Sequence, residues 1–186
     1  MTSQEYFDLT HEIVNSKNPQ TPYDEPDYHQ YTVMNETRMK RWLKMNPITE
    51  ETTNIIHSIS QPQTWILITE PWCGDAAHIV PILHLMSQLN ARITLEIQLR
   101  DSNSEIEKYL TNGTKSIPVL IVRDTHGEDI FHWGPRPKAA QDIYLELKAQ
   151  QMDSDEIKAS IQNFYNKDKS LNIQKEVSAL IKTQAN

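Results

Sequence analysis

The sequence of 186 residues contains few cysteines, few glycines and no long apolar run. Its single cysteine, Cys73, cannot form an internal disulfide, and disulfides are typical of exported proteins. No segment approaches the ~20 apolar residues that a membrane span requires. The first five residues, Met-Thr-Ser-Gln-Glu, lack the basic and apolar segments of a signal peptide. We therefore expect a cytoplasmic protein that does not associate with a membrane.

Positive charge is also scarce, because 18 Lys and Arg residues face 25 Asp and Glu residues, which gives a net charge of −7. A general nucleic-acid binder needs a positive field, so we expect no nucleic-acid partner. Residues 112–116 do not form a P-loop, because their lysine does not follow a glycine. The four glycines are too far apart for a phosphate-binding GxGxxG loop: Gly74, Gly113, Gly127 and Gly134.

The seven histidines form no recognisable metal motif. His11 and Glu12 begin like the zinc signature HExxH, but Asn15 occupies the place of the second histidine. His78 and His84 are six residues apart in a predicted helix, so they point about 120° away from each other. We expect His78 at the helix surface. The sequence therefore predicts neither a metal nor a cofactor.

The first 62 residues have apolar side chains at helical spacing. Helices are predicted near residues 6–13 and 31–45, separated by a proline-rich loop at 15–27. A third helix is predicted to open at Asn46-Pro47 and to end before Pro62. The basic face of the second helix, which includes Arg38, is interpreted as solvated; the alternative is a docking patch.

From Trp65 onward the pattern indicates strands that alternate with helices. The continuous apolar run at 65–69 is typical of a central strand covered on both faces. After a helix at 76–89, strict alternation at 93–99 predicts a strand near a sheet edge, parallel to the first. Further strands are predicted at 118–122 and 129–133, joined by a hairpin turn.

The remaining helices are predicted from their ends. Ser102 and Glu105 form a capping box that should open a short helix, with Gly113 closing it. Pro137 suits the first turn of the next helix, and Asp153 is predicted to cap another. The C-terminal helices either pack on the core or mediate dimerisation, and the sequence leaves the oligomeric state open.

Four short segments resemble the thioredoxin superfamily. Residues 72–76, Trp-Cys-Gly-Asp-Ala, stand where that family has Trp-Cys-Gly-Pro-Cys, directly after the central strand. Pro81 matches the proline that kinks the family's active-site helix. Ile117-Pro118 resembles the family's Ile-cis-Pro segment, and Gly134 falls where the family has a glycine after its last strand.

The resemblance covers residues 65–150. The whole sequence looks like uncharacterised bacterial thioredoxin-like proteins with a Trp-Cys-Gly-Asp motif and a Gly-Pro-Arg-Pro loop at 134–137. It implies an α/β thioredoxin-like fold, in which helices flank a mixed central sheet. The expected organisation is an N-terminal helical extension at 1–62, a thioredoxin-like core at 63–151 and a C-terminal helical extension at 152–186, packed on the core.

Cys73 is the candidate catalytic residue. A thiol in the first turn of a helix faces unpaired N–H groups and a positive dipole, which lower its pKa below ~8.5. The resulting thiolate is the species that attacks disulfides. Asp75 opposes this effect if its carboxylate lies close, so the net direction of the shift is open. Dithiol chemistry is excluded, because Ala76 replaces the second cysteine; Leu67 also replaces the family's buried carboxylate.

Two functions remain. In the first, Cys73 forms a mixed disulfide with a low-molecular-weight thiol or with a cysteine-containing protein, and a second thiol resolves it. In the second, the chain is a redox-inactive binding or interaction module. Arg136 is expected to offset Asp75, to bind a carboxylate on a thiol ligand, or to be solvated. By the resemblance, the residues around the sulfur are Trp72, Gly74, Asp75, Ile117, Pro118, Gly134 and Arg136.

Overall fold

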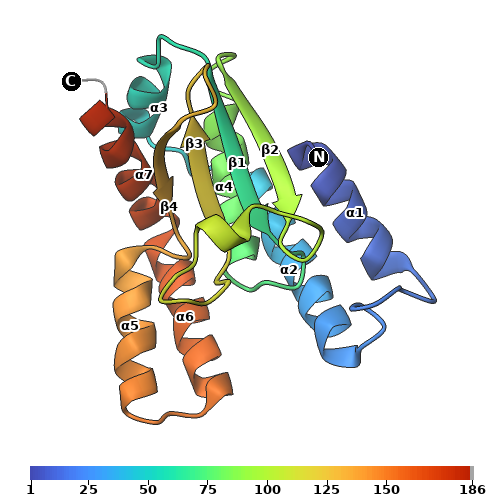
Figure 1. Ribbon diagram of the computed structural model, residues 1–186. Helices are drawn as coiled ribbons and strands as arrows, with labels where there is room; N and C mark the ends of the chain where they lie inside the picture. The colour runs from blue at the N-terminus through green and yellow to red at the C-terminus, as the bar shows by residue number, and fades with distance from the viewer. Residues whose placement is uncertain (185–186) are drawn as a thin grey trace.

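The computed structural model describes residues 1–184, which fold into a four-stranded sheet with helices around it (Figure 1). The helices before and after the first strand are α1 (Ser3–Asn15), α2 (Pro26–Met45), α3 (Glu50–His57) and α4 (Ala76–Ser87). The strands are β1 (Gln63–Thr69), β2 (Ile93–Leu99), β3 (Val119–Arg123) and β4 (Asp129–Trp133). A 3-10 turn, η1 (Ile106–Lys108), precedes β3, and the chain ends in α5 (Lys138–Ala149), α6 (Ser154–Asp168) and α7 (Leu171–Gln184).

The strand order is β2-β1-β3-β4. β1 pairs in parallel with β2 and antiparallel with β3, and β3 pairs antiparallel with β4. This arrangement confirms the predicted central strand, the parallel pair joined by a helix, and the hairpin. β2 lies at the edge and alternates buried and exposed residues, as its sequence predicts. Its edge is covered by the N-terminus, because the Ile97 N–H donates to the Met1 carbonyl at 2.7 Å.

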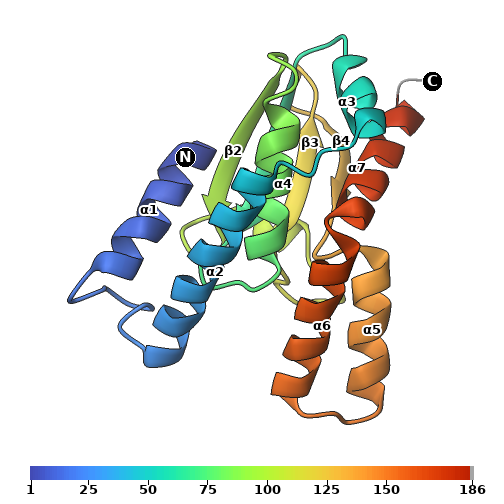
Figure 2. The same cartoon turned by 180° about the vertical axis from the view of Figure 1, so that it is seen from behind.

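The helices cover the sheet unevenly. α2 and α4 lie over one face, and the segment that contains η1 crosses the other face (Figures 1 and 2). α7 runs beside β4, and α3 packs against α7. The antiparallel pair α5 and α6 extends past the end of the sheet. The start of α4, which carries the candidate site, therefore lies between α2 and α6.

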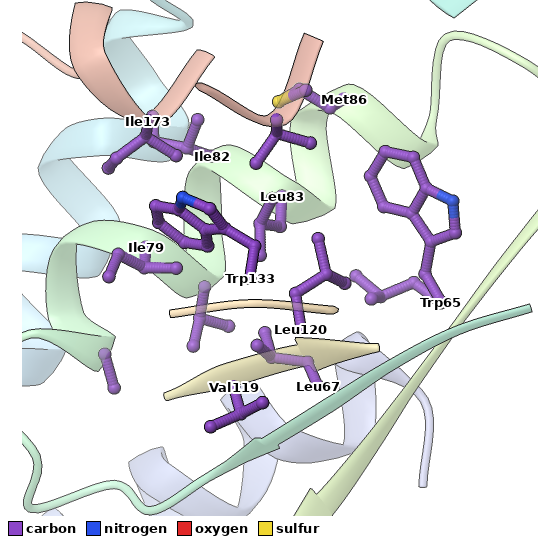
Figure 3. Packing of buried hydrophobic residues seen from close by; sticks show 14 of the residues in the cluster. Trp65, Leu67, Ile79, Ile82, Leu83, Met86, Val119, Leu120, Trp133 and Ile173 are labelled. Atoms are coloured by element: carbon purple, nitrogen blue, oxygen red, sulfur yellow. The ribbon is translucent and has the colours of Figure 1, made fainter. Parts of the chain in front are cut away.

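Most residues of α4 are buried, and the polar His84 is one of the two that stay partly exposed. Figure 3 shows Ile79 and Leu83 of α4 close to Trp133 of β4, with Ile173 of α7 on the far side of that indole. These side chains belong to one continuous cluster of buried residues that extends from α1 to α7. The burial of most of α4 explains why its apolar residues form a broad stripe.

Two predicted helix starts are wrong. α3 begins at Glu50 and is capped by Thr49, whose hydroxyl accepts from the Thr52 N–H at 3.2 Å. Asn46 instead ends α2 in a left-handed conformation that asparagine tolerates. The capping box at 102–105 opens no α-helix, because the Glu105 carboxylate binds the Arg123 guanidinium at 2.8–2.9 Å. Only the short η1 forms there; the predicted Asp153 cap is confirmed.

Candidate functional site

Cys73 lies in the loop that links β1 to α4, and its side chain belongs to the buried hydrophobic cluster. The residue is 7% exposed. Its thiol donates to the Ile117 carbonyl at 3.5 Å, next to the cis Ile117–Pro118 bond that the resemblance implies. Asn35 of α2 fixes the loop from outside, since its amide donates to the carbonyls of Pro71 and Cys73 at 2.9 and 3.1 Å. The helix α2 therefore helps to position the cysteine.

The thiol is neutral in this environment. Burial, followed by the charge of Asp75, raises the pKa of Cys73 to about 12. Backbone N–H groups of Asp75 and Ala76 and the charge of Arg136 lower that pKa by smaller amounts. The helix start thus stabilises the thiolate of Cys73, but burial and the charge of Asp75 outweigh this effect. The direction of the pKa shift that the sequence left open is therefore upward.

Asp75 carries the negative charge of the site and has a complete set of partners. Arg136 donates to it from Nη2 at 2.6 Å and from Nε at 3.1 and 3.2 Å. The Tyr165 hydroxyl of α6 donates to the other carboxylate oxygen at 2.6 Å. The Arg136 guanidinium also lies 4.7 Å above the Tyr144 ring. Of the three roles open for Arg136, the structure therefore assigns it to the neutralisation of Asp75.

Gly134 allows the loop after β4 to approach this region. Its φ is +133°, and a Cβ there would lie 2.3 Å from the Pro118 carbonyl oxygen. Any other residue would thus push the loop away from Pro118. Gly134 and Pro118 pack against each other, and the Ile117 carbonyl receives the thiol. The remaining predicted site residues line one cavity: Trp72, Cys73, Gly74, Asp75 and Arg136.

This cavity has a volume of about 320 Å³ and lies between α2, the start of α4 and α6. Tyr31 and Arg38 of α2 form one wall. The opposite wall comes from α6, and Tyr144 of α5 contributes beside it. Two larger and more open depressions, of about 570 and 560 Å³, are not lined by Cys73. Half of the residues that line the space beside the cysteine therefore come from helices outside the predicted core segment at 63–151.

His78 is buried, not at the surface as predicted. Its Nδ1 accepts from the Trp42 indole N–H at 2.9 Å, and Nε2 lies 3.1 Å from Gln162 Oε1. The neutral ring must therefore carry its proton on Nε2. Burial lowers the pKa of His78 to about 3, assisted by the charges of Arg38 and Arg41. The ring also stacks on Tyr165 at 4.2 Å, so it joins α2, α4 and α6.

Glu70 is a buried carboxylate near the site that the sequence reasoning missed. It is 4% exposed and follows β1 directly. It accepts from the Asp101 backbone N–H at 3.0 Å and from the Tyr23 hydroxyl at 3.4 Å. Burial raises its pKa. The only available signal was a charged residue directly after an apolar strand, which is normally an exposed position.

Residues 1–184 place no group of three or more His, Cys, Asp or Glu side chains where they could hold a metal ion. Among the same residues, none of the helices combines the length and apolar character needed to cross a membrane.

Comparisons with known proteins agree with the fold. An HIV 4E10 epitope-scaffold has 17% identity and a TM-score of 0.59, over 98% of this chain and 99% of that one. A protein of unknown function from Pseudomonas aeruginosa has 16% identity and a TM-score of 0.58, over 98% of both chains. No curated protein matches the sequence. The family model described as thioredoxin matches residues 22–156, which is most of the chain. The chain belongs to the thioredoxin family.

Proposed function

We propose that the chain is a binding protein of the thioredoxin family, in which Cys73 forms part of a ligand cavity and does not exchange disulfides. The observation that carries this proposal is the burial of the thiol beside the cavity, which raises the pKa of Cys73 to about 12. The neutral thiol then acts as a small, weakly polar wall residue.

The acidity of the thiol argues against exchange chemistry. With a pKa of about 12, on the order of one Cys73 in 10⁵ is thiolate at pH 7, against about 3% for an ordinary cysteine. Because the thiolate is the attacking species, this small fraction would slow exchange through Cys73, and the higher intrinsic nucleophilicity of a high-pKa thiolate offsets only part of the loss. The chain also has no second thiol to resolve a mixed disulfide.

The cavity itself favours binding. Its volume of about 320 Å³ falls at the small end of the range for small-molecule sites. Aromatic and aliphatic side chains line it, and a few polar groups converge on it. This combination is typical of a site that holds an apolar ligand body and orients it through polar contacts.

Monothiol exchange is the second candidate, because Cys73 lines the cavity and two backbone N–H groups favour its thiolate. Its partner would be a low-molecular-weight thiol or a cysteine-containing protein. A ligand that displaces the negative charge of Asp75 from the sulfur would lower the pKa of Cys73. In this hypothesis, Cys73 becomes reactive only after a ligand has bound in the cavity.

Alkylation separates the two functions. The rate of iodoacetamide addition to Cys73 is measured against pH in the folded protein and in urea, and intact mass is recorded after incubation with glutathione disulfide. For a binding protein, we expect the folded chain to react far more slowly than the unfolded chain at pH 7, without a glutathione adduct. Cys73→Ser is the blank. Half-maximal alkylation at or below pH 8.5, together with a stoichiometric adduct, would establish monothiol exchange instead.

A further inference from the structure

The cavity beside Cys73 is positively charged, although the chain carries a net charge of −7. Three cationic side chains line it, and Asp75 is its only carboxylate among the described residues. Two of the cations already have anionic partners. Arg136 binds Asp75 at 2.6 Å, and the exposed Lys158 binds Asp155 at 2.9 Å and the Tyr31 hydroxyl at 2.9 Å. The third cation is Arg38.

Arg38 is partly buried and has no carboxylate within ion-pair distance among residues 1–184. Its Nη1 donates to the Asn35 side-chain oxygen at 3.0 Å, and the same Asn35 is held by the carbonyls of Pro71 and Cys73. The guanidinium is therefore oriented, while Nε and Nη2 have no acceptor among the described residues. Two parallel N–H groups of this kind match the two oxygens of a carboxylate.

Much of the remaining lining is apolar, although Gln162 and His78 also contribute to it. Trp72, Ile157 and Ile161 line the cavity, and the Tyr144 ring lies beside them. A water molecule occupies about 30 Å³, so a cavity of about 320 Å³ holds on the order of ten heavy atoms. Only one cation lacks a partner, so a dianionic phosphate would carry one charge without a counterpart. The site thus fits one negative charge on a short apolar body.

Building on the proposed binding function, we propose that the cavity binds a small amphipathic carboxylic acid. The carboxylate would pair with Arg38, and the apolar body would lie against Trp72 and Ile161. The neutral Cys73 thiol would then contact the ligand without reacting with it.

Calorimetric titration of the full chain with four probes of similar size tests this inference. The probes are octanoate, 3-phenylpropanoate, octanamide and octylamine. We expect the better of the two acids to bind at least tenfold more tightly than octanamide, and octylamine to bind most weakly. The relative affinity of octanoate and 3-phenylpropanoate identifies an aliphatic or an aromatic body.

Two variants locate the interaction. Arg38→Gln should abolish the preference for acid over amide while leaving octanamide affinity unchanged. Arg41→Gln is the matched control, because Arg41 lies one turn further along α2, is exposed and does not line the cavity. Gly74→Leu should weaken both ligands, since a Cβ at Gly74 meets no atom within 4 Å and the side chain can fill the space.

The outcomes distinguish the inference from the proposed function. If none of the four probes binds, a small-molecule cavity is the wrong function. If octanamide or octylamine binds as tightly as the acids, the cavity binds ligands but the carboxylate preference is wrong. If Arg38→Gln retains the acid preference, Arg38 is not the anchor. The titrations of the unmodified protein decide the ligand class even if that variant does not fold.

Discussion

Two carboxylates stand on either side of Cys73 in the sequence, and the fold treats them differently. Glu70 is 4% exposed and Asp75 is 8% exposed, so their burial is nearly equal. Asp75 binds the Arg136 guanidinium and the Tyr165 hydroxyl. Glu70 has only neutral hydrogen-bond donors, the Asp101 backbone N–H and the Tyr23 hydroxyl.

Partners, not burial alone, decide what a buried carboxylate does. The charge of Asp75 is balanced by an arginine 61 residues away, and this pair forms part of the cavity wall. Glu70 forms no ion pair among the described residues; burial raises its pKa, and the charge of Arg100, which pairs with Asp101, opposes that shift only in part. A buried charge that loses its partner costs several kcal/mol, whereas a carboxyl group that is easily protonated costs little to replace.

The largest expected effect is that of Asp75→Asn, which leaves the half-buried Arg136 guanidinium without its carboxylate. We expect a loss of about 3 kcal/mol in the free energy of unfolding. Urea denaturation at pH 7 measures it. Asp142→Asn is the matched control, because the exposed pair of Asp142 with Lys138 is worth about 0.5 kcal/mol or less.

The double variant Asp75→Asn/Arg136→Gln sharpens this test. Removing both charges should recover part of the lost stability, because no uncompensated charge is left. If Asp75→Asn costs as little as Asp142→Asn, Asp75 and Glu70 do not differ in how much the fold depends on their charge.

Tyr165→Phe is expected to have the next largest effect. The substitution removes the hydroxyl that donates to Asp75 at 2.6 Å and keeps the ring that stacks on His78. A hydrogen bond to a charged group contributes about 2 kcal/mol, so we expect a loss of that size in the free energy of unfolding. Urea denaturation measures the loss. A loss below about 0.5 kcal/mol would mean that Arg136 alone satisfies Asp75.

Glu70→Gln tests how the stability that Glu70 contributes depends on pH. Burial raises the pKa of Glu70 in the folded state, so its protonated form is favoured there. The stability that Glu70 contributes is complete below its unfolded pKa and is lost as pH rises through the folded value. We therefore expect wild type to lose stability relative to Glu70→Gln as pH rises from about 4 to 7.

At pH 7, Glu70→Gln should be at least as stable as wild type, with a difference within about 1 kcal/mol. Thermal unfolding at pH 4, 5.5 and 7 measures the trend. Stability that instead rises with pH in wild type relative to the variant would reverse the sign of the shift and contradict the argument.

The sequence predicted the parts of the site that lie close together along the chain. The Trp-Cys-Gly-Asp segment after an apolar strand and the Ile117–Pro118 segment were recognisable, because each combines a motif with an adjacent strand. The three alternatives for Arg136 were also visible, although the sequence could not decide among them. Short-range sequence patterns and the family resemblance are therefore enough to predict those parts of the site that are local in the sequence.

The wall of the cavity that α6 forms was not predictable in this way. Tyr165 lies 90 residues after Asp75, and nothing in the helical pattern of α6 marks that tyrosine as a partner of Asp75. The exposure of Cys73 depends on how closely α2 and α6 pack over it, which the spacing of apolar residues does not define. Its pKa could not be predicted for the same reason, since burial and Asp75 act only through three-dimensional distance.

The smallest expected effect is that of Tyr23→Phe, the counterpart of Tyr165→Phe. The Tyr23 hydroxyl lies 3.4 Å from Glu70, so the bond is long, and a carboxyl group with a raised pKa depends less on such a donor. We expect a loss of no more than about 0.5 kcal/mol in the free energy of unfolding. Urea denaturation of both tyrosine variants under the same conditions gives the ratio of their losses in the free energy of unfolding. If Tyr23→Phe costs as much as Tyr165→Phe, Glu70 is held as a charged group in the folded protein, and its neutral donors suffice to stabilise it.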